Sequence, residues 1–133
     1  MTTYYGLEFC LIPVNVKWIP IAAIDVEENR KMAAYVGDNF FKVVIKEDRY
    51  NKLSHNGRAC LLLHEAGHVL VEGASSGEPH NFDAERLADS FAYKKMGRLK
   101  FFLGVWEIGR ILGTSISVRL YRGLWKFEKE VKK

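Results

Sequence analysis

Apolar residues recur at helical spacing through the second half of this chain and predict a series of helices. The first lies in a proline-free apolar frame over 58–71. The second runs over 81–97, with Asn81 as its N-cap and Gly97 just past its end. A third, over 101–112, is apolar nearly all round, so we expect it to be central to the core. Its apolar residues include Phe102, Val105, Trp106, Ile108 and Leu112. A last helix is expected beyond Gly113, with a buried stripe of Ile116, Leu120, Leu124, Phe127 and Val131.

The first half of the chain has shorter apolar runs broken by turn residues. The runs over 7–12 and 18–24 fit a helix or a strand equally well. Two stronger runs, 32–36 and 40–45, flank the turn residues 37–39 and predict a β-hairpin. The expected fold class is therefore α+β, a small antiparallel sheet or hairpin packed on a mainly helical part.

Length and composition fit one compact domain. The chain has 133 residues, 48% of them hydrophobic, which is enough for one core and leaves no room for a second sizeable domain. We expect a β-rich part over 1–53 and a helical part over 54–133. The longest apolar stretch, 9–24, is broken by polar residues and two prolines, so no membrane span is expected. With no basic signal-peptide start and only Cys10 and Cys60, the sequence predicts a cytoplasmic protein without disulfides.

The most informative motif is the run His64-Glu65-Ala66-Gly67-His68. On an α-helix, residues four apart share a face, so His64 and His68 can bind one metal ion from the same side. Glu65 projects about a hundred degrees round the helix from His64, away from the ligand position but within reach of a water on the metal. So short a pattern can arise by chance, although two histidines in an apolar frame are costly to bury without partners.

A catalytic zinc site needs a third protein ligand. The candidates downstream are His80, Asp83, Glu85 and Asp89. Glu85 and Asp89 lie on a stripe of small and apolar residues with Ala88, Ala92 and Met96. If that stripe faces the first helix, Glu85 can bind the metal while Asp89 accepts the outward N–H of a ligand histidine. The alternative is that both carboxylates belong to a solvated face. His80 is the weaker candidate because it follows a loop over 73–79.

The two motifs in this order, His64 to His68 and Glu85-Arg86-Leu87-Ala88-Asp89, resemble the gluzincin pattern of zinc metallopeptidases. The pair of motifs resembles those of the prenyl-protein endopeptidases with their bacterial heat-shock relatives, and those of the small ImmA/IrrE-type domains of phages and mobile elements. The resemblance covers 58–97 and implies a minimal zincin-like fold. It also implies one zinc ion held by His64, His68 and Glu85, with Glu65 as the catalytic base and acid and Asp89 as a support.

The resemblance implies a metallopeptidase that hydrolyses a protein or peptide substrate with a metal-activated water. The predicted hairpin would offer main-chain groups to an extended peptide, or would only cover the core. A donor for the tetrahedral oxyanion is also needed, and the sequence leaves five candidates open. They are Tyr93, His80, Arg110, Arg119 and Tyr121. Two other hypotheses are open. One is a regulatory or binding module in which zinc is structural and the basic C-terminal helix binds nucleic acid or a protein partner, and the other is a degenerate zincin that binds no metal.

The net charge is concentrated at the C-terminal end. Residues 114–133 hold six basic and two acidic groups, and the 14 basic and 14 acidic groups of residues 1–113 cancel, so the formal +4 lies entirely in the last segment. A basic stripe of this kind attracts nucleic acid, acidic protein or an anionic surface. More often it is only a solvated face, and no recognised nucleic-acid motif accompanies it.

Overall fold

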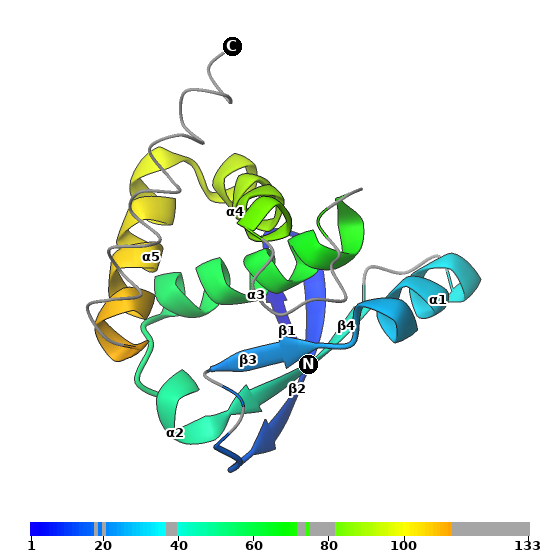
Figure 1. Ribbon diagram of the computed structural model, residues 1–133, viewed down its shortest axis with the longest axis horizontal. Helices are drawn as coiled ribbons and strands as arrows, with labels where there is room; N and C mark the ends of the chain where they lie inside the picture. Colours follow the sequence, from blue (N-terminus) through cyan, green and yellow to red (C-terminus); the bar gives the residue numbers. More distant parts are fainter. Residues whose placement is uncertain (18, 20, 37–39, 72–73, 75–81, 113–133) are drawn as a thin grey trace.

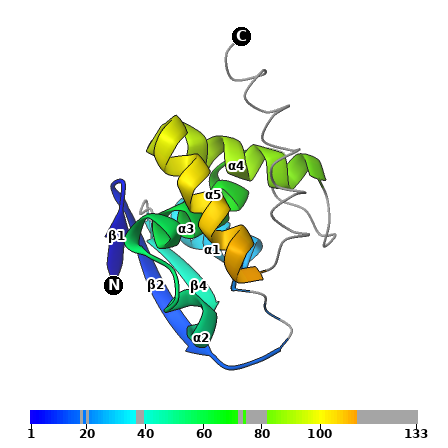
Figure 2. The same cartoon turned by 90° about the vertical axis from the view of Figure 1, so that its left-hand side faces the viewer.

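The computed structural model describes residues 1–17, 19, 21–36, 40–71, 74 and 82–112 (Figure 1). Its elements, in chain order, are β1 (Thr2–Tyr4), β2 (Leu7–Val14), β3 (Ala22–Ile24), α1 (Val26–Val36), β4 (Phe40–Lys46), α2 (Glu47–Tyr50), α3 (His55–Leu70), α4 (Phe82–Met96) and α5 (Arg98–Leu112). The helices α3, α4 and α5 lie together on one side of the sheet (Figure 2). The α+β fold class expected from the sequence is confirmed.

The sheet has four strands in the order β1-β2-β4-β3 and is mixed. Its central strands, β2 and β4, are parallel, and each outer strand is antiparallel to its neighbour. Phe9 is paired with Phe41, both are fully buried, and their rings stack at 5.4 Å between centroids. Val43 and Ile45 continue the buried row on β4. Because side chains alternate along a strand, this row forms the face that packs against α3.

The predicted β-hairpin over 32–45 is wrong. Residues 32–36 are the end of α1, and β4 pairs with β2 and β3. The helix begins after Asp25, whose carboxylate accepts a hydrogen bond from the Glu28 N–H at 2.9 Å. The side chain of Asn29 accepts a hydrogen bond from the Lys42 N–H at 3.0 Å and thereby fixes α1 against β4. The apolar run is therefore the last turn and a half of a capped helix, and the predicted turn 37–39 lies outside the described residues.

The central helix α3 is fixed at its start by α5. Ser54 is its N-cap and accepts a hydrogen bond from the Gly57 N–H at 3.3 Å. The Glu107 carboxylate accepts hydrogen bonds from the N–H of Ser54 and from its hydroxyl. Further along α3, Leu62 and Leu63 are fully buried between the sheet and the other helices. The helix that carries the two histidines is thus held both by its cap and by the core.

The helix α5 starts at Arg98, three residues before the predicted bound. It follows directly on Gly97, whose φ of 84° suits glycine at the end of α4. Phe101, Val105 and Ile108 lie in the core, as expected for this helix, whereas Trp106 is 53% exposed on its outer face. The predicted helix beyond Gly113 lies outside the described residues. None of the helices in the described part of the chain has the length and apolar character needed to cross a bilayer.

The helices α3 and α4 approach each other most closely at Gly67. A Cβ atom added there would lie 2.8 Å from the carbonyl oxygen and 2.9 Å from the Cα of Ala88. Alanine is the better helix former, but this contact is with backbone, which cannot move without separating the helices. We expect Gly67→Ala to lower the free energy of unfolding by roughly 1–2 kcal/mol, as measured by urea denaturation.

The matched control for Gly67→Ala is Lys94→Ala, at an exposed position on α4. This second variant tests helix propensity without the close contact, and we expect its urea midpoint to stay near that of the wild type. An unchanged or higher midpoint for Gly67→Ala would contradict the close approach of the two helices.

Candidate metal centre

Two histidines of α3 and one glutamate of α4 converge on a single point. The Nε2 atoms of His64 and His68 are 3.2 Å apart. One carboxylate oxygen of Glu85 lies 2.8 Å from the Nε2 of His64, and the other lies 3.3 Å from that of His68. One ligand atom from each of the three residues falls within 4.8 Å of the others. The i, i+4 spacing supplies the histidine pair, and the packing of α4 on α3 supplies the carboxylate.

The outward nitrogens of both imidazoles are held by oxygen atoms. The Nδ1 of His64 lies 2.7 Å from a carboxylate oxygen of Asp89, and the Nδ1 of His68 lies 2.7 Å from the carbonyl oxygen of Ala74. A carbonyl can only accept, so the proton of a neutral His68 is on Nδ1. The same tautomer of His64 suits the Asp89 carboxylate. When both imidazoles are neutral in this tautomer, their Nε2 atoms carry lone pairs directed towards the Glu85 carboxylate.

This donor set fits a zinc ion. Two lone pairs and a carboxylate facing one another repel unless a positive charge lies between them. In tetrahedral coordination with Zn–N bonds of about 2.0–2.1 Å, two ligand atoms stand about 3.3 Å apart, close to the observed 3.2 Å between the Nε2 atoms. The side chains of His64 and His68 are 15% and 13% exposed, whereas that of Glu85 is 49% exposed. The cluster is therefore open to solvent on its Glu85 side.

The electrostatics of the cluster favour a cation. Burial opposes a charge on His64, but the negative charge of Asp89 and the hydrogen bonds to Asp89 and Glu85 hold its pKa well above the usual value. Burial also disfavours the charged form of Glu85, yet its hydrogen bonds to His64 and His68 keep the pKa of this carboxyl well below its usual range. A site that attracts protons in this way attracts a divalent metal ion by the same potential, and the two compete.

Glu65 is buried on α3 next to His64. Burial raises the pKa of its carboxyl above the ordinary value, and the imidazoles of His64 and His68 only partly offset this effect. A carboxyl group with a raised pKa holds a proton more readily than an exposed one, which is the property a general base and acid needs. Its environment thus suits a proton carrier beside the cluster.

Of the remaining residues that the sequence suggested for the site, some lie in the described part of the chain and some outside it. Asp83 is exposed in the first turn of α4, its carboxylate lies 3.7 Å from the Arg86 guanidinium, and it is not part of the cluster. Tyr93 packs its ring edge-on against Phe101 and Phe102, at 5.5 and 6.2 Å between centroids. Arg110 is exposed on α5. Three candidates, His80, Arg119 and Tyr121, lie outside the described residues.

Two contacts at the end of α3 have no signal in the sequence. Ala74 is fully buried, and its carbonyl oxygen orients His68, but every residue has a carbonyl group, so the side chain cannot reveal this role. Arg30 on α1 donates a hydrogen bond from Nε to the Val69 carbonyl oxygen at 3.1 Å. This contact satisfies one of the last carbonyl groups of α3 and ties α1 to the helix that carries the histidines.

The chain was also compared with known proteins. No protein-family model, no curated protein and no solved structure matches it.

Proposed function

We propose that the protein is a zinc-dependent metallopeptidase of the gluzincin type. His64, His68 and Glu85 would hold one zinc ion, and Glu65 would carry protons during hydrolysis. The observation that supports this most strongly is the convergence of the three ligand atoms within 4.8 Å beside a buried carboxyl group of raised pKa. Two histidines and a glutamate are a ligand set of catalytic zinc sites, which keep a fourth position open, whereas structural sites are closed by four protein ligands.

Each residue of the cluster has a definite task in this proposal. A bound zinc ion would supply Lewis acidity to a peptide carbonyl and to the attacking water. Glu65 takes the proton of that water and passes it to the nitrogen of the leaving amine. Asp89 and the Ala74 carbonyl keep the imidazoles in the tautomer that leaves Nε2 unprotonated. The exposed side of Glu85 is where a peptide can approach.

The proposed substrate is a segment of a protein or peptide whose backbone can approach the exposed side of Glu85. We place the reaction in the cytoplasm, a proposal supported by Cys10 and Cys60, both of which are free.

The test is to measure metal content, fold and hydrolysis on one preparation. We expect about one zinc ion per chain and hydrolysis of an unstructured fluorogenic peptide, lost on chelation and restored by zinc. Chelated protein should keep its far-UV circular dichroism and most of its urea midpoint, because the core is built from residues outside the cluster, such as Phe9, Phe41 and Phe101. Unfolding on chelation would instead indicate a structural zinc module, and failure to bind zinc would indicate a degenerate site.

A further inference from the structure

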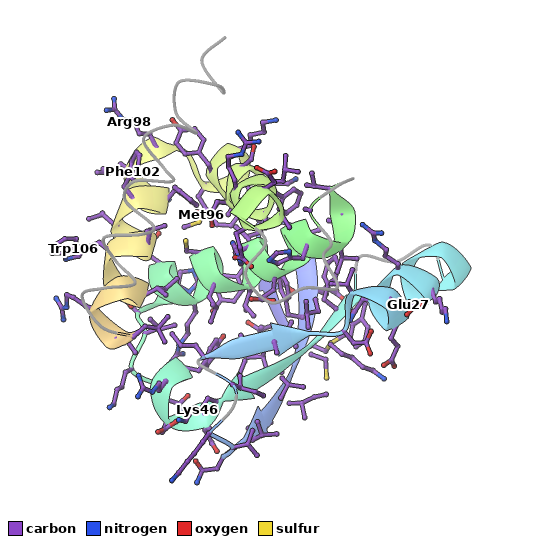
Figure 3. All side chains as sticks on the ribbon, in the orientation of Figure 1. Glu27, Lys46, Met96, Arg98, Phe102 and Trp106 are labelled. Atoms are coloured by element: carbon purple, nitrogen blue, oxygen red, sulfur yellow. The ribbon has the colours of Figure 1, made fainter. Side chains whose placement is uncertain are left out.

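The outer face of α5 carries a strip of exposed apolar side chains. Leu99 is 72% exposed, Leu103 54% and Trp106 53%. Their spacing of four and three residues places them on one side of the helix. Figure 3 shows Trp106 on the outer side of α5, directed away from the other helices. Three large hydrophobic residues this exposed on one helix face call for a partner.

Basic side chains surround this strip. Arg98 and Lys100 flank Leu99, and Arg110 continues the strip beyond Trp106, all three exposed. Lys94 and Lys95 lie in the last turn of α4, just before α5 in the chain. The sequence from 90 to 106 has four basic residues and no aspartate or glutamate. We call the three apolar residues, together with Arg98, Lys100 and Arg110, the α5 strip.

We propose that the α5 strip docks on an anionic lipid surface. A convex helix face with protruding leucines and a tryptophan fits the boundary between lipid head groups and acyl chains. The flanking guanidinium and ammonium groups would lie at the level of the anionic head groups, with their aliphatic stems over the apolar surface. The proposal does not depend on the metal centre, since the α5 strip shares no residue with the zinc cluster.

Charge argues against the two other obvious partners. The segment 114–133 carries six basic and two acidic groups, so placing it on the α5 strip would bring like charges together. The negative charge of nucleic acid would suit the basic side chains, but the aliphatic side chains of Leu99 and Leu103 neither pair with phosphates nor stack on bases. An anionic bilayer attracts both the strip and the basic segment and also accepts the leucines.

The experiment is co-sedimentation of the full-length protein with vesicles of phosphatidylcholine alone or with 30 mol% phosphatidylserine. We expect binding to the anionic vesicles only, weakening as salt is raised. Each basic side chain near the surface contributes about fivefold to the partition coefficient, so Arg98→Gln/Lys100→Gln should lower it about 25-fold. Leu103→Gln/Trp106→Gln should lower it by at least about tenfold, because the apolar insertion is lost.

Matched controls separate the strip from general surface effects. Ile12 is 40% exposed on β2, and the side chain of Lys31 is 78% exposed on α1. These two elements lie away from α5 (Figure 1), so Ile12→Gln and Lys31→Gln should bind like the wild type. Urea midpoints of all variants verify that they are folded.

Four outcomes would overturn the proposal. The first is equal or absent binding to both kinds of vesicle. The second is wild-type binding by the strip variants together with loss in Lys126→Gln/Lys129→Gln, which would assign binding to the basic segment alone. The third is that Leu103→Gln/Trp106→Gln lowers the urea midpoint but leaves the partition onto anionic vesicles unchanged. This result is expected if another part of the chain covers the α5 strip. The fourth is conversion of a dimer to a monomer by that variant without vesicle binding.

Discussion

Glutamine in place of Glu65 is expected to leave one zinc ion per chain and to lower kcat for peptide hydrolysis by about a thousandfold. The amide is almost isosteric with the carboxylate, so the packing of this buried position on α3 is kept. What disappears is the group that accepts the proton of the attacking water and returns it to the leaving amine. His64 and His68, which hold the metal in our proposal, are unaltered.

The measurement pairs zinc content, by elemental analysis, with initial rates on a fluorogenic peptide. The control is Glu27→Gln, which makes the same chemical change where the side chain is 84% exposed on α1, and it should keep full activity. Undiminished hydrolysis by Glu65→Gln would contradict the peptidase proposal. A regulatory or binding module with structural zinc would then be the better hypothesis.

The histidine pair of the site could be predicted because its arrangement depends only on helix geometry. His64 and His68 are one turn apart in any α-helix, and a strong apolar frame made that helix predictable. The contribution of Glu85 and Asp89 needed a second step, the docking of α4 onto α3. The sequence indicated this step through a carboxylate stripe that includes the small residue Ala88. That the face packs against Gly67 is a property of the folded chain.

The sheet shows why other parts were not predictable. The run over 32–36 has the composition of a short strand, but it continues a helix whose cap, Asp25, lies seven residues earlier. Parallel pairing of β2 with β4 requires a crossover between them, and neither strand contains a local signal for its partner. Hydrophobic periodicity reports which face of an element is buried, not which element buries it. The same limit explains why the exposure of Trp106 on α5 could not be predicted from its apolar character.

Glu85 is the residue whose loss tests the proposed zinc site most directly. We expect Glu85→Ala to raise the Kd for zinc by about a hundredfold or more, because two imidazoles alone leave a divalent ion without a charged ligand. Competition with a chromophoric chelator at pH 7.5 measures this Kd directly. The matched control is Asp83→Ala, which removes a carboxylate from the same first turn of α4 but from outside the cluster, and its zinc affinity should equal that of the wild type.

The comparison of these two variants distinguishes a metal centre from an ion-pair network. In the absence of metal, Glu85 also pairs with the imidazoles of His64 and His68, so its loss can alter stability whether or not zinc binds. Stability alone is therefore not diagnostic, whereas the Kd is. If both variants bind zinc as tightly as the wild type, the third ligand lies elsewhere, with His80 or Asp89 as the sequence candidates. The gluzincin assignment would then fail, although a histidine-based zinc site would survive.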